Sequence, residues 1–120
     1  MAQEPTTSDT SDRLLQILRG TFLSEVRLDR PDLSMRQLAI ALIIYKTDEL
    51  QTVRGLARHL NISKPAVTRA LDRLGEFDIV RRKIDPSDRR SVLAMRTTVG
   101  AAMVGRLQAA VSNISSEMLP

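Results

Sequence analysis

Few side chains in this sequence have the types and spacing that catalysis or metal binding needs. The 120 residues contain no cysteine and a single histidine, His59, which excludes disulfides, thiolate chemistry and clusters of Cys and His ligands. Two carboxylates, Asp85 and Asp88, lie close together, but they stand among arginines, so ion pairing explains them. There is no glycine-rich phosphate loop and no metal-ligand spacing. We therefore expect no enzyme activity, no cofactor and no metal site.

The chemistry that remains is the binding of a polyanion by basic side chains. Residues 1–50 hold 6 basic and 8 acidic side chains, residues 51–96 hold 11 and 5, and residues 97–120 hold one of each. One basic segment in a neutral-to-acidic frame predicts a localised polyanion-binding face. An ordinary solvated surface is also rich in Lys and Arg, so the charge distribution alone does not decide between the two.

Residues 53–74, VRGLARHLNISKPAVTRALDRL, have the pattern of a helix-turn-helix. Ala57 is small where two helices would cross, Asn61 accepts the left-handed turn conformation four residues later, and Val67 supplies a branched core residue. Thr52 and Ser63 can cap the two helices. A plain helical hairpin with a solvated face is the alternative interpretation.

The second helix of this pair would present one polar face, which could line the major groove of double-stranded DNA. Two strands are predicted to follow, at about residues 79–84 and 91–96, with a turn at residues 85–90 that places Pro86 at its second position. Arginines at the tip of such a wing could enter a minor groove, where the negative potential is enhanced. The predicted DNA-binding residues are Ser63, Lys64, Pro65, Thr68, Arg69, Arg73, Arg89 and Arg90.

Further helices must hold this pair in place. Residues 1–10 are polar and predict a disordered tail, and a first helix is expected at about residues 11–28. Ser34 followed by Gln37 is a capping-box pattern, and the helix that it opens, at about 35–47, is apolar on nearly every side and therefore central. A last helix is expected at about 98–118, so residues 11–120 are interpreted as a single domain.

The predicted fold is mainly α with a small β wing: a winged helix-turn-helix whose N- and C-terminal helices form a helical dimerisation region. Aromatic residues make up only 2% of the chain, which favours packed helices over an all-β sandwich. Apolar residues recur at three- and four-residue spacing in both terminal helices, as where helices pair; packing on the chain's own core is the alternative. The expected interface residues are Leu15, Leu18, Phe22, Val104, Leu107, Val111 and Ile114.

The stretch from about Ser34 to Gly100 resembles the multiple-antibiotic-resistance regulator (MarR) family of bacterial winged-helix proteins. The resemblance is carried by residues 53–74 and by IVRRKIDPSDRRSVLAMRTTVGAAM, which begins at Ile79. It implies that Asp88 orients Arg90 and that Arg90 enters the minor groove. Gly100 resembles the family's entry into the C-terminal helix. Relatives often bind aromatic acids in a cavity, but no aromatic lining here indicates a small-molecule effector.

These observations predict a cytoplasmic, nucleoid-associated transcriptional regulator that binds a palindromic site on double-stranded DNA as a homodimer. No apolar run is long enough to cross a membrane, so no membrane partner is expected. The alternative is a winged-helix module that binds another protein without direct DNA readout, because fold alone does not settle function. Basic residues on both the second helix and the wing favour DNA.

Overall fold

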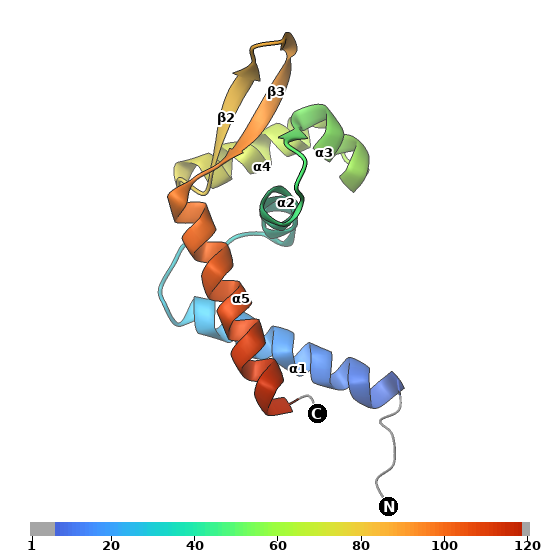
Figure 1. The fold of residues 1–120 in the computed structure, drawn as a ribbon, viewed down its shortest axis with the longest axis vertical. Coiled ribbons are helices and arrows are strands. Elements are labelled where there is room, and N and C mark those ends of the chain that lie inside the picture. Colours follow the sequence, from blue (N-terminus) through green and yellow to red (C-terminus); the bar gives the residue numbers. More distant parts are fainter. Residues whose placement is uncertain (1–6, 119–120) are drawn as a thin grey trace, which may run out of the picture. The chain divides into compact units, whose positions relative to one another are not determined.

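The computed structural model describes residues 7–118, and it confirms the mainly helical fold with one small antiparallel sheet (Figure 1). The chain divides into two compact units. One is Leu33–Val104, and the other joins the chain up to Asp32 with the residues from Gly105 onward. The elements are α1 (Thr7–Val26), α2 (Met35–Lys46), β1 (Gln51–Thr52), α3 (Val53–Leu60), α4 (Lys64–Glu76), β2 (Val80–Asp85), β3 (Asp88–Arg96) and α5 (Thr98–Met118).

Capping side chains set the starts of the helices in the unit Leu33–Val104. The predicted capping box at α2 is confirmed: the Ser34 hydroxyl accepts from the backbone amide of Gln37 at 3.1 Å, and the side-chain oxygen of Gln37 accepts from the backbone amide of Ser34 at 2.9 Å. The hydroxyls of Thr52 and Ser63 each accept from one backbone amide and so cap α3 and α4. Each cap gives a partner to an amide at a helix start that has none within the helix.

The first helix begins earlier than predicted. Residues 1–6 of the predicted tail lie outside the described residues, but Thr7 already belongs to α1. Asp9 lies in the first turn, where a carboxylate stabilises the positive end of the helix dipole. The polar character of the segment suggested a tail, yet polar residues are compatible with the exposed first turn of a helix.

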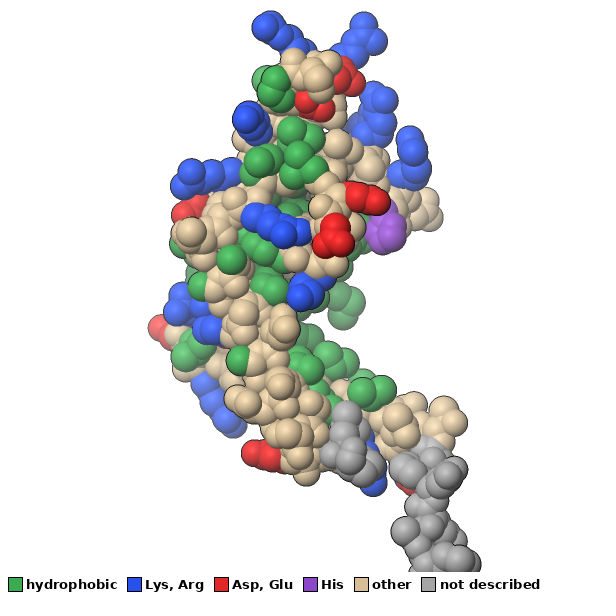
Figure 2. Space-filling model, in the orientation of Figure 1, with side chains coloured by type: hydrophobic (Ala, Val, Ile, Leu, Met, Phe, Trp, Pro, Cys, Tyr) green, Lys and Arg blue, Asp and Glu red, His purple; other side chains and the backbone are tan. Residues whose placement is uncertain are grey.

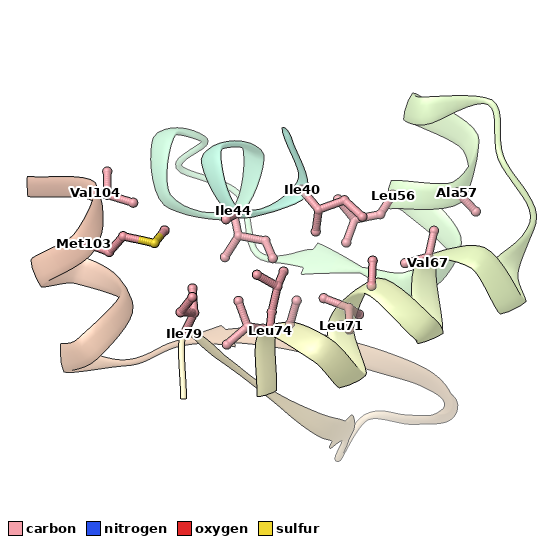
Figure 3. Close-up of a cluster of buried hydrophobic side chains, with 14 residues drawn as sticks. Ile40, Ile44, Leu56, Ala57, Val67, Leu71, Leu74, Ile79, Met103 and Val104 are labelled. Atoms are coloured by element: carbon pink, nitrogen blue, oxygen red, sulfur yellow. The ribbon is translucent and has the colours of Figure 1, made fainter. Parts of the chain in front are cut away.

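The core of the unit Leu33–Val104 lies where α2, α3 and α4 pack together over the sheet (Figure 3). Its centre is fully dry: Ile40, Leu56 and Val67 have no solvent-exposed surface. The predicted inward face of α4 is confirmed, because the side chains of Val67, Ala70, Leu71 and Leu74 are all buried. The start of α5 contributes Met103 and Val104 to the same cluster. One continuous core therefore fixes the helix pair against the sheet.

The sheet has one more strand than predicted. The residues of β1 pair with β3, and β2 pairs with its other side, giving the order β1-β3-β2. A strand of two residues is too short to show an alternation of apolar and polar side chains, so the sequence pattern did not predict β1. The wing turn is also tighter than predicted, because β3 begins at Asp88 and leaves only Pro86 and Ser87 between the strands. Arg89 and Arg90 accordingly lie in a strand, not in a loop.

The second unit consists of α1 and the part of α5 that follows Val104. Glu25 on α1 receives two hydrogen bonds from the Arg106 guanidinium on α5, at 3.0 and 3.2 Å. Gly20 lies against Ile114, so close that a Cβ at Gly20 would come within 2.7 Å of that side chain. Within residues 7–118, no helix combines the length and apolarity needed to cross a membrane.

Candidate nucleic-acid interface

Helices α3 and α4 form the predicted helix-turn-helix. Asn61 ends α3 with φ 55° and ψ 46°, in the left-handed region, and the Ile62 amide donates to the Ala57 carbonyl at 3.1 Å. Ala57 and Val67 are buried, as the pattern requires. The turn therefore has the geometry predicted from its residues, and it orients α4 so that one face is buried and the other is exposed.

The exposed face of α4 carries the predicted binding residues. Ser63, Lys64, Pro65 and Arg69 are exposed, and Thr68 is half-buried. Lys64 and Arg69 form no ion pair with any side chain in the described part of the chain. Their charges are available to a ligand without first breaking an internal contact.

Two other charged side chains of α4 are already engaged. Arg73 forms an ion pair with Glu76 at 2.7 Å, and its guanidinium lies 4.4 Å from the centre of the Phe77 ring. Asp72 forms an ion pair with Arg82 on β2, which joins the exposed face of α4 to the wing. The contact with Glu76 could have been found from its three-residue spacing on a helix, but nothing in the sequence indicated the pair between Asp72 and Arg82.

The tip of the wing is a tight turn held by one carboxylate. Asp85 accepts from both the backbone amide and the hydroxyl of Ser87, at 2.9 and 2.8 Å, an arrangement typical of Asp at the start of a turn. These hydrogen bonds keep the pKa of the Asp85 carboxyl below its ordinary value. Because a depressed pKa stabilises the fold only while the group is ionised, the contact is present at neutral pH and is lost as the pH falls through that pKa.

Asp88, which the resemblance assigns to orienting Arg90, contacts the backbone of that residue. Its carboxylate accepts from the backbone amide of Arg90 at 3.1 Å, and none of the ion pairs among residues 7–118 joins it to the Arg90 guanidinium. A short Asp side chain reaches the amide two residues ahead more readily than a guanidinium that extends away. In this structure Asp88 holds the backbone that carries Arg90, while the Arg89 and Arg90 side chains are exposed.

The wing carries more positive charge than the predicted site residues alone provide. Figure 2 shows Lys and Arg side chains standing out around the wing end of the view. On β2, the consecutive residues Arg81, Arg82 and Lys83 are all exposed. A strand with one buried face would alternate apolar and polar residues, so three basic residues in a row were a signal that both faces of the hairpin are solvated here.

The predicted interface residues fall into two groups. On α1, Leu15, Leu18 and Phe22 are 64%, 45% and 44% exposed, and Val111 on α5 is exposed as well. Val104 and Leu107 are instead buried within their own chain, and Ile114 is half-buried against Gly20. The chain itself therefore covers much of the surface of these three positions on α5.

The residues considered for catalysis are not arranged as an active site. His59 is exposed on α3, and Asp85 is engaged by Ser87. Across residues 7–118, no group of three or more His, Asp or Glu side chains is placed to hold a metal ion. The exposed side chains of α4 and the wing form a basic surface instead.

Comparisons with known proteins agree with this geometry. The model of the MarR family matches residues 33–92, half of the chain. The transcriptional regulator Tm0710 from Thermotoga maritima has a TM-score of 0.74 at 19% identity, over 92% of this chain and 78% of that one. RV1404 from Mycobacterium tuberculosis has a TM-score of 0.77 at 20% identity, over 99% and 83%.

A third similar structure is a variant of MepR from S. aureus bound to an oligodeoxyribonucleotide, with a TM-score of 0.75 at 19% identity over 97% of this chain and 83% of that one. No curated protein sequence matches the chain. At these identities the solved structures show the fold, and the family model shows the kinship. The chain belongs to the MarR family of winged-helix transcriptional regulators.

Proposed function

We propose that this regulator binds a palindromic site on double-stranded DNA, with α4 in the major groove and the wing in the minor groove. The observation that carries the proposal is that α4 and the wing belong to one compact unit and both expose basic side chains without acidic partners in the described chain. On α4 these are Lys64 and Arg69, and on the wing Arg89 and Arg90. MarR proteins are transcriptional regulators, not enzymes, and the similar MepR variant was solved with an oligodeoxyribonucleotide.

Each element suits a different groove. An α-helix fits the major groove, where Arg and Lys can donate to guanine O6 and N7. A narrow minor groove attracts inserted arginines, because its negative potential is enhanced. The buried faces of α4 and of the sheet share one core, so α4 and the wing are held in a fixed orientation to each other.

Salt dependence separates DNA binding from the alternative of a protein-binding module. Binding that neutralises several phosphates releases counterions, so the logarithm of the affinity should fall linearly with the logarithm of the salt concentration. We expect a slope that becomes shallower by about one unit in the variant Lys64→Gln. If the protein bound neither random nor natural duplexes at low salt, the proposal would be contradicted.

The contact between Asp88 and the backbone of Arg90 gives a prediction for the wing. Asp88→Ala should weaken DNA binding about fivefold, because losing one hydrogen bond of about 1 kcal/mol loosens the strand that carries Arg90. Asp88→Asn keeps an oxygen that can accept from the amide and removes a charge that repels phosphate. It should therefore bind as tightly as the wild type or more tightly.

Titrations of a fluorescent duplex over a salt series measure the DNA affinity of the wild type and of the two Asp88 variants. Weak binding by both Asp88→Ala and Asp88→Asn would show that the carboxylate charge itself matters, as expected if Asp88 orients the Arg90 guanidinium. Tighter binding by Asp88→Ala than by the wild type would remove any positioning role for Asp88. Arg90→Ala, the positive control, should lose affinity most on sites with A·T-rich flanks.

We further propose that two copies of the chain pair through the exposed apolar face of α1, formed by Leu14, Leu15, Leu18 and Phe22, which are 50%, 64%, 45% and 44% exposed. An exposed apolar stripe of this size on one helix is typical of an interaction site. The second copy is its occupant because a palindromic site requires two recognition helices related by two-fold symmetry.

Leu18→Lys should convert the dimer to a monomer, because it places a charge in the middle of this stripe. Sedimentation velocity at micromolar concentration measures the change, and circular dichroism confirms that the helices remain. The matched control is Gln16→Lys on the same helix. Gln16 lies outside the stripe and donates a hydrogen bond to Asp12. Leu107→Glu is a poorer test, since Leu107 is buried and its loss would unfold the chain. A dimer that survives Leu18→Lys would exclude this face as the interface.

A further inference from the structure

The hydroxyl of Tyr45 lies where the two strands of the wing begin and end. Tyr45 is in the last turn of α2, and its hydroxyl donates to the Ile79 carbonyl at 2.6 Å, directly before β2. The same oxygen accepts from the amide of Thr97 at 2.9 Å, directly after β3. One phenol oxygen of one helix therefore binds both ends of the hairpin.

Two neighbouring side chains complete this attachment. Thr97 donates its hydroxyl proton to the Asp78 carbonyl at 2.5 Å and accepts from the Gly100 amide at 2.9 Å, which caps the start of α5. Arg96, the last residue of β3, donates to the carbonyls of Ile44 and Thr47 at 2.9 and 2.7 Å, at the end of α2. We call Tyr45, Arg96 and Thr97 the Tyr45 cluster.

Apart from the apolar core that it shares with the helices, the wing has only weaker polar attachments. The pair of Asp72 with Arg82 is exposed to 49% and 42%, and exposed ion pairs contribute little. On the far side, β1 provides a ladder of only two residue pairs. The bonds of the Tyr45 hydroxyl are partly buried, where a donor left without an acceptor is costly. The Tyr45 cluster is thus the main polar attachment at the base of the wing.

A small change at the base would become large at the tip. The register runs from Val80 opposite Arg96 at the base to Asp85 opposite Asp88 at the tip, and five steps of about 3.3 Å make a lever about 16 Å long. A rotation of about 10° at the base would then move the tip by about 3 Å, given that same strand rise. Hydrogen bonds do not tolerate such a displacement, so contacts made by Arg90 depend on how the base is held.

We propose that Tyr45 and Arg96 are positioning residues for DNA recognition: they fix the wing to the end of α2, so that α4 and the wing tip reach adjacent grooves together. The inference rests on the proposed function of the wing. It assigns a role in binding to side chains that lie at the base of the wing, away from the tip that would contact DNA.

Tyr45→Phe tests this by removing a single oxygen. The variant should remain folded at 25 °C, but the Thr97 amide should exchange its hydrogen faster, along with the amides of β2 and β3. Its affinity for a duplex with A·T-rich flanks should fall roughly tenfold, and its preference for A·T-rich over G·C-rich flanks should shrink. Arg96→Lys, which keeps the charge but loses the forked donor, should behave in the same way and serves if Tyr45→Phe does not fold.

The matched control is Ser34→Ala, which removes the capping box at the other end of α2. It should lower the melting temperature to a similar degree and leave the flank preference unchanged. A flank preference in Tyr45→Phe equal to that of Ser34→Ala would overturn the proposal, because the cluster would then act on stability alone. Unchanged hydrogen exchange at the wing amides of Tyr45→Phe would also overturn the positioning role. If the wild type itself bound no duplex, the proposed function would fail, independently of the role of Tyr45.

Discussion

Replacing Gly100 by alanine is expected to destabilise the unit Leu33–Val104 by about 3 kcal/mol or more, which is a large part of the stability of a small domain. A Cβ at this buried position would overlap the Tyr45 hydroxyl and the Ile79 carbonyl, and it would lie 2.6 Å from the Tyr45 ring. The carbonyl belongs to the backbone and cannot turn aside. The clash would break the hydrogen bonds that hold the base of the wing.

Gly105→Ala is the matched control, since it makes the same change five residues later on α5. A Cβ at Gly105 meets nothing within 4 Å, and alanine is a better helix former than glycine by about 1 kcal/mol. This variant should therefore be slightly more stable than the wild type. Urea unfolding monitored by circular dichroism measures both free energies. Equal stabilities for the two variants would contradict the packing described around Gly100.

The second large effect is expected at Arg69. Arg69→Ala should weaken binding to the preferred DNA site by about 1–3 kcal/mol, or roughly 5- to 150-fold, because Arg69 is exposed on α4 and has no acidic partner in the described chain. Its affinity for unrelated duplexes should change much less. The expected result is thus a loss of discrimination between sequences as well as a loss of affinity.

Arg73→Ala provides the contrast on the same helix. Arg73 is held by Glu76 and Phe77, and an exposed pair of this kind is weak enough to exchange its partner for a phosphate. Its removal should lower affinity for all duplexes alike and reduce the salt slope by about one unit. Competition titrations with specific and random duplexes distinguish the two patterns. If Arg73→Ala lost discrimination and Arg69→Ala did not, their assigned roles would be reversed.

The helix-turn-helix could be predicted because its signals are local. Thr52 and Ser63 cap helices that begin one residue later, and Asn61 adopts the backbone conformation that its type favours. Each of these preferences depends on atoms a few residues apart. The basic wing was found for the same reason, since a hairpin joins strands that are neighbours in the sequence.

The features that were missed depend on residues far apart in the chain. Tyr45 meets Thr97 across 52 residues, and nothing about a lone tyrosine in an apolar helix indicates that contact. The spacing of Val104 and Leu107 showed that they would be buried, but spacing cannot say whether the chain itself or a second copy covers them. The short strand β1 owes its existence to β3, which offers it a free edge.

Selection of bound duplexes from a random DNA pool tests the central claim most directly. We expect the bound fraction to converge on an inverted repeat, with half-site centres about one helical turn apart and A·T-rich positions where the wings would lie. Such a repeat would show sequence-specific binding and two-fold symmetry in one experiment. A pool that stays random after repeated rounds at low salt would contradict the account.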